Sequence, residues 1–133
     1  MPLPASRLPK TIVSAIDEEK MLAIRAGAGP HRFIGIWAVV VEGRVFVRSW
    51  SLQARSWYRT FREDPVGAIH VRGRTVRIRA RFPTGQRLLD AVSDAYAAKY
   101  HTPGSVKYVR DLGRAKSRET TTELVPFGAG RSR

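Results

Sequence analysis

Two pairs of β-rich runs joined by two-residue turns constrain the fold more than any other feature of this sequence. Glu42-Gly43 separates the apolar run FIGIWAVVV, residues 33–41, from RVFVRS, residues 44–49. Arg72-Gly73 joins two further runs in the same way. Because such a turn ending in glycine favours a β-hairpin, both pairs predict neighbouring antiparallel strands. The run 33–41 is apolar almost throughout, which predicts one strand buried on both faces.

The strand that follows Arg72-Gly73 alternates between apolar and basic residues. A strand directs successive side chains to opposite faces, so the apolar set is expected to face the core. The inward set is Val76, Ile78, Ala80 and Phe82, and the outward set is Thr75, Arg77, Arg79 and Arg81. The outward arginines are interpreted either as a solubilising face or as contacts to a nucleic acid.

The other segments supply helices and two more strands. Apolar residues at helical spacing predict helices over residues 11–19, 84–100 and 105–112. Two β-rich runs predict strands over residues 20–26 and 120–126, and residues 114–119 are expected to form a charged linker.

These elements predict a mainly β (α+β) fold, a small six-stranded antiparallel split barrel with three or four short helices packed outside. We expect a single domain over residues 11–126. A flexible N-terminal arm is expected at 1–10 and a flexible C-terminal tail at 127–133.

The charge of the chain points to an anionic partner. Its 133 residues contain 24 lysines and arginines against 11 acidic residues, a formal net charge of +13. Such a balance favours nucleic acid, nucleotide or lipid-headgroup partners. Nineteen of the cations are arginine and five are lysine, a ratio that GC-rich coding also produces. The charge alone therefore does not select a nucleic acid.

Several classes of site and location are disfavoured by composition. The absence of cysteine excludes disulfides, thiolate catalysis and Cys-ligated metals. The histidines lie in different segments without a matched carboxylate spacing, so no metal site is predicted: His31, His70 and His101. No apolar run approaches the ~20 residues that span a bilayer, and the N-terminus lacks the apolar core of a secretory signal. A cytoplasmic location without membrane attachment is expected.

The stretch VFVRSWSLQARSWYRTFREDP, residues 45–65, is the candidate ligand site. A strand that opens through a serine-bearing loop into a helix start exposes backbone N–H groups to an anion. Arginines flank this opening and aromatic residues offer flat surfaces, a combination that suits a ligand with a phosphate and a planar ring. The candidate cofactor-binding residues are Arg48, Ser49, Ser51, Arg55, Trp57 and Tyr58. The alternative interpretation places Trp57 in the core and the arginines on a solvated face.

A resemblance to a known family rests on segments spread over residues 11–126. They are IWAVVVEGRVFVRS (36–49), SWYR (56–59), DP (64–65), HVRGRTVRIRARF (70–82), AYAAKY (95–100) and TTTELVP (120–126). Together they resemble an uncharacterised bacterial family of the split β-barrel superfamily that binds FMN or deazaflavin. The superfamily that the chain resembles includes proteins like pyridoxamine-phosphate oxidases and deazaflavin-dependent nitroreductases. The resemblance implies a six-stranded split barrel, often a homodimer, with the cofactor phosphate near residues 45–65.

The resemblance also implies a function and residue roles. Arg48, Ser49 and Arg55 would contact the phosphate or ribityl chain, and Trp57 and Tyr58 would shape the pocket wall. The chain departs from similar sequences at Leu52-Gln53, where they place glycine. The implied function is binding of FMN or deazaflavin, with a small-molecule oxidoreductase as the corresponding activity and no catalytic residue assigned.

Two alternatives to the flavin hypothesis remain. One is a basic nucleic-acid-binding module that uses the outward arginines of residues 77–81. The other is a barrel that binds no ligand.

Overall fold

The structure is a computed structural model that describes residues 7–49 and 56–128. Within these residues it has seven strands and five helices. In chain order they are α1 Lys10–Glu18, β1 Leu22–Ala26, β2 Ile34–Ile36, β3 Ala38–Val41, β4 Arg44–Val47, α2 Trp57–Glu63, β5 Val66–Val71, β6 Arg74–Arg81, α3 Gln86–Lys99, α4 Pro103–Leu112, α5 Ala115–Arg118 and β7 Thr122–Pro126.

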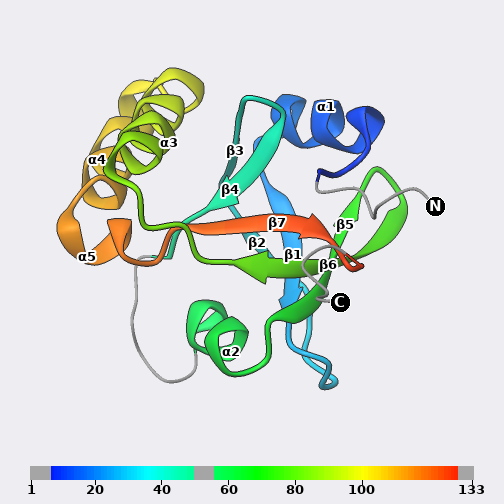
Figure 1. The fold of residues 1–133 in the computed structure, drawn as a ribbon. Coiled ribbons are helices and arrows are strands. Elements are labelled where there is room, and N and C mark those ends of the chain that lie inside the picture. Colours follow the sequence, from blue (N-terminus) through cyan, green and yellow to red (C-terminus); the bar gives the residue numbers. More distant parts are fainter. Residues whose placement is uncertain (1–6, 50–55, 129–133) are drawn as a thin grey trace.

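All seven strands belong to one antiparallel sheet with the order β2-β1-β5-β6-β7-β4-β3. The two outermost strands, β2 and β3, are separated in sequence only by Trp37. The chain therefore passes from one end of the sheet to the other within a single residue. This connection curls the sheet into a nearly closed, barrel-like shape (Figure 1).

The prediction of one continuous strand over residues 33–41 is therefore wrong. Trp37 interrupts it: its indole stacks on the Tyr100 ring, with the ring centroids 4.1 Å apart and the planes 3° from parallel. Its carbonyl accepts a hydrogen bond from the Tyr96 hydroxyl at 2.9 Å. Side chains of α3 and of its C-terminal end thus hold the residue at which the strand divides. The division gives seven strands where the sequence predicts six.

The two predicted hairpins are confirmed. Glu42 and Gly43 have φ of 53° and 75°, and Arg72 and Gly73 have φ of 48° and 78°. Positive φ at both central residues is the geometry of a type I′ turn, whose twist matches the flanking strands. The outward direction of the arginines on β6 is also confirmed, because Ile78 and Ala80 are buried while Arg77 and Arg81 are exposed.

Two apolar cores lie on opposite sides of the sheet. The inner core fills the barrel and receives α1 and α2; it includes Ile12, Ile16, Ile24, Phe61, Ile69 and Ile78. The outer core lies between β3–β4 and helices α3 and α4; it includes Val39, Phe46, Val92, Tyr96 and Leu112. Figure 1 shows α3, α4 and α5 together on one side of the sheet, with α1 and α2 above and below it.

The ends of the chain bear on the expected domain limits. The predicted arm and tail fall partly on residues 1–6 and 129–133, which lie outside the described part of the chain. Leu8 is buried in the inner core. The expected charged linker over residues 114–119 contains the single turn of α5.

Among the residues that the structure describes, no helix is both long and apolar enough to cross a membrane.

Candidate functional site

Arg48, the first candidate residue, follows β4 and is buried, with 3% of its surface exposed. Its Nε donates to the Thr121 hydroxyl at 2.8 Å. Its Nη1 donates to the Ser93 hydroxyl at 2.8 Å and to the Leu112 carbonyl at 2.9 Å. Its Nη2 donates to the Leu89 carbonyl at 2.8 Å. Four of the five guanidinium N–H groups thus point to oxygens of the protein itself.

All four of these acceptors are neutral, and burial lowers the pKa of Arg48 to about 10. The Leu112 carbonyl ends α4, where the helix dipole is negative and favours a cation. Arg48 therefore joins β4 to α3, α4 and the segment before β7. In this position it acts as a structural support for the fold.

Ser49 is likewise held by the segment before β7. Its backbone N–H donates to the Thr120 hydroxyl at 2.8 Å, and its carbonyl accepts from the same hydroxyl at 3.2 Å. The next candidates along the chain, Ser51 and Arg55, lie outside the described residues, as does the Leu52-Gln53 departure. The expected anion-binding loop therefore stays a prediction.

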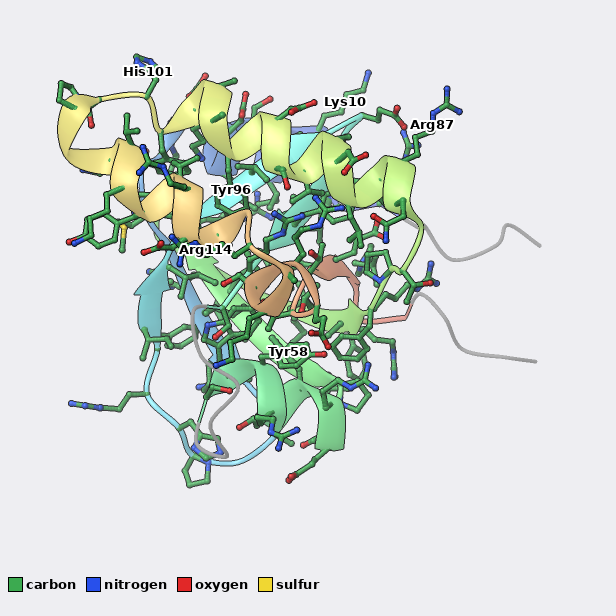
Figure 2. The ribbon with its side chains drawn as sticks, turned by 90° about the vertical axis from the view of Figure 1, so that its left-hand side faces the viewer. Lys10, Tyr58, Arg87, Tyr96, His101 and Arg114 are labelled. Atoms are coloured by element: carbon green, nitrogen blue, oxygen red, sulfur yellow. The ribbon has the colours of Figure 1, made fainter. Side chains whose placement is uncertain are left out.

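The two aromatic candidates begin α2, whose N-cap Ser56 accepts a hydrogen bond from the Arg59 backbone N–H at 3.2 Å. The Tyr58 hydroxyl donates to the Glu119 carbonyl at 3.2 Å, and its ring packs edge-on against Phe82. Figure 2 shows Tyr58 between α2 and α5. Trp57 instead packs edge-on against Phe61 and lines a pocket. The Trp57 and Tyr58 rings also pack edge-on against each other, with their centroids 6.4 Å apart, and of the two residues Trp57 is the one that lines this pocket.

The pocket at Trp57 has a volume of about 540 Å³ and lies between β1, β2, their connecting loop and α2. Apolar side chains of the two strands form part of its lining, and Trp57 and Thr60 contribute from α2. His31 and Arg32 add an imidazole and a guanidinium from the loop. The described residues of the lining are Ile24, Ala26, His31, Arg32, Ile34, Trp57 and Thr60.

Sequence reasoning missed His31 and Arg32 as candidate site residues. They follow the GAGP turn between two expected strands, a position in which loops often carry ligand-binding groups. That position was the available signal. It could not show that the loop would face Trp57, because α2 lies about 25 residues further along the chain and meets β1 only in the folded barrel.

Comparison with known proteins places the chain in a family. A family model described as "Uncharacterized protein conserved in bacteria (DUF2255)" matches residues 11–124. The chain belongs to this family. No curated protein matches it. The chain is also similar to the solved structure of conserved hypothetical protein Rv2991 from Mycobacterium tuberculosis, with a TM-score of 0.59 and 14% identity over 97% of this chain and 86% of that chain. At this identity the likeness concerns the fold alone.

The family's description assigns no chemistry, so the pocket has to be interpreted from its own side chains. A half-buried indole, an apolar lining and two nitrogen-bearing side chains can recognise a planar ring that carries an anionic group. Within residues 7–49 and 56–128, no three potential metal-ligating side chains gather. These side chains can bind and orient a ligand, and a bound cofactor would contribute the reacting atoms.

Proposed function

We propose that this protein binds FMN or a deazaflavin in the pocket between β1 and α2. We also propose that its barrel-like sheet is a split β-barrel of the superfamily that the sequence resembles. The observation that carries the proposal is the pocket lined by Trp57, His31 and Arg32. Its volume of about 540 Å³ lies within the range of roughly 300–1,000 Å³ that is usual for cofactor sites.

The residues of the pocket fit the two parts of such a ligand. The indole of Trp57 and the side chains of Ile24 and Ile34 offer flat and apolar surface to a fused ring system. Arg32 can donate two parallel hydrogen bonds to a phosphate, and His31 can donate one. The phosphate contact that the resemblance implies for Arg48 is reassigned to Arg32, because the guanidinium of Arg48 is engaged within the fold.

The proposed activity is that of a flavin- or deazaflavin-dependent oxidoreductase of small molecules. When bound, the cofactor would accept or give the electrons. The chain's own part would be to orient the ring against Trp57 and to hold the anionic group at the loop between β1 and β2.

Mass spectrometry of small molecules released from gently purified protein tests this proposal directly. Calorimetric titration with FMN and with a deazaflavin would then give the affinity. Arg32→Gln should weaken binding about tenfold or more, since a charge-assisted contact is worth about 1.5–3 kcal/mol. Trp57→Leu should weaken it through loss of the ring surface.

A matched control is Arg87→Gln, which removes one positive charge from the exposed start of α3, away from the pocket (Figure 2). This variant should bind the cofactor as the parent does. If the parent releases no flavin or deazaflavin and binds neither in titration, the proposed function is wrong.

A further inference from the structure

A second cavity, of about 210 Å³, lies on the outer face of the sheet at β1, β5 and β6. The strand register places Arg25 of β1 opposite Ala68 of β5, and Ala68 opposite Arg77 of β6. Residues that are directly opposite in antiparallel strands share a face. The two arginines therefore flank the small side chain of Ala68, one strand away on each side.

Arg25 belongs to the opposite side of β1 from the proposed flavin pocket. Its neighbours Ile24 and Ala26 are buried in the inner core and line that pocket, whereas Arg25 lines the outer cavity. Successive side chains of a strand point to opposite faces. The two cavities are therefore separate sites with different side chains.

Among the described residues, the lining of the outer cavity has two cations and no acid: Arg25, Gly27, Ala28, Val66, Gly67, Ala68, Arg77 and Phe127. Neither arginine forms an ion pair with another described residue. The nearby carboxylate of Asp64 instead accepts a hydrogen bond from the Ala28 backbone N–H at 2.9 Å. The cavity is thus electropositive without a counter-charge from the described chain.

The Nε atom of Arg25 gives the strongest indication of a ligand. Among the described residues it is the single buried side-chain nitrogen or oxygen without a hydrogen-bond partner. Buried polar atoms are almost always paired, so an unpaired donor calls for an explanation such as an absent ion. The guanidinium of Arg25 lies 4.8 Å from the Phe33 ring centre, and that of Arg77 lies 3.8 Å from the Phe127 ring centre. Stacking on these rings orients both planar groups and leaves N–H edges for an acceptor.

We propose that this outer cavity binds a phosphate group, as free phosphate or on a small metabolite, between Arg25 and Arg77. A tetrahedral oxyanion presents several acceptor oxygens, which suits two guanidinium groups that approach from opposite sides. The cavity is large enough for a phosphate group and smaller than the usual cofactor site. The proposal does not depend on the flavin pocket.

Calorimetric titration with inorganic phosphate tests the site. A titration with chloride at the same ionic strength is the control. Phenyl phosphate in a parallel titration distinguishes a phosphate monoester from the free ion. Arg25→Gln and Arg77→Gln should each lower phosphate affinity about tenfold or more, because each removes a charge-assisted contact. Circular dichroism of both variants confirms that they fold.

Two control variants separate this site from the flavin pocket and from net charge. Arg32→Gln changes the flavin pocket alone and should retain phosphate binding at the outer cavity. Arg87→Gln lowers the net charge equally and should also retain it. The proposal is overturned if the parent binds neither phosphate probe, or if folded Arg25→Gln and Arg77→Gln bind phosphate as tightly as the parent.

Discussion

The hydroxyl of Tyr96 accepts a hydrogen bond from the backbone N–H of Arg48 at 3.0 Å. The same hydroxyl donates to the carbonyl of Trp37, so one side chain of α3 fixes both the end of β4 and the break between β2 and β3. Burial raises the pKa of Tyr96 well above its usual range, and burial also raises the pKa of Tyr100 to about 12.

These raised pKa values predict a loss of stability in alkali. In the unfolded chain a tyrosine loses its proton near pH ~10, whereas both folded tyrosines keep theirs. Their contribution is complete below that pH and falls as pH rises, by up to about 1.4 kcal/mol per pH unit for each group. Urea unfolding at about pH 9 and about pH 11 measures this fall.

Tyr96→Phe tests which group is responsible. The variant should be less stable at every pH, because two hydrogen bonds are lost, but its stability should fall less steeply in alkali. The lowered pKa of Arg48 acts in the opposite direction, because a group whose pKa is lowered in the folded state adds stability as the pH rises. An unchanged alkaline slope in Tyr96→Phe would contradict the assignment.

Arg48→Ala should destabilise the fold by at least about 3 kcal/mol. Hydrogen bonds to charged groups contribute about 1.5–3 kcal/mol each, and this change removes two that Arg48 donates to the backbone carbonyls of Leu89 and Leu112. Total stabilities of ~5–15 kcal/mol make such a loss easy to measure by chemical denaturation. The exposed Arg87→Ala, on α3, should change stability by no more than about 0.5 kcal/mol. A stable Arg48→Ala protein that has lost cofactor affinity would restore the ligand role implied by the sequence.

Gly67→Ala should destabilise the sheet where β1 meets β5. A Cβ at Gly67 would collide with the backbone carbonyl oxygen of Arg25 and lie 3.0 Å from Cε1 of Phe61. Because a backbone atom cannot rotate away, the strands must separate, at a cost of about 1–3 kcal/mol. Thermal unfolding would measure this loss of stability as a lower melting temperature. Gly104→Ala in α4, where a Cβ meets nothing within 4 Å, should be neutral or stabilising by up to ~1 kcal/mol. Equal melting temperatures for the two variants would refute the collision.

Replacing Arg77, Arg79 and Arg81 together by Gln should leave flavin or deazaflavin affinity intact and lower solubility. None of the three lines the pocket at Trp57, and Arg77 and Arg79 lie over the Phe127 ring. Titration of the triple variant with the cofactor measures the first effect, and precipitation with salt measures the second.

The same variant tests the nucleic-acid alternative. Each phosphate that a protein neutralises on a single strand changes the slope of log affinity against log salt by about −0.7. Tight, steeply salt-dependent binding of labelled single-stranded DNA by the parent would favour that alternative, provided that the slope flattens by about two units in the triple variant.

The features that could be predicted from the sequence depend on local signals. Glu42-Gly43 and Arg72-Gly73 need only their own backbone preferences to form turns, and both form them. The long helix α3 follows from apolar residues at helical spacing, and its Leu89, Val92 and Tyr96 are buried.

The features that escaped prediction depend on residues far apart in the chain. The strand break at Trp37 requires the ring of Tyr100, and Arg48 finds its side-chain partners 41 to 73 residues away. An arginine next to a serine has the same local sequence pattern whether its guanidinium binds a phosphate or forms buried hydrogen bonds within the fold. For the same reason, neither segment alone indicates that Arg32 and Trp57 line the same pocket.

The last strand that the structure describes, β7, lies between β6 and β4 near the middle of the sheet. During synthesis, the edges of β4 and β6 that pair with β7 therefore stay unpaired until residues 122–126 have emerged. Exposed strand edges are templates for pairing with other chains, and pairings between distant segments form slowly. A nascent chain that still lacks β7 therefore exposes two strand edges to other chains, and a chaperone that shields strand edges would act in that interval.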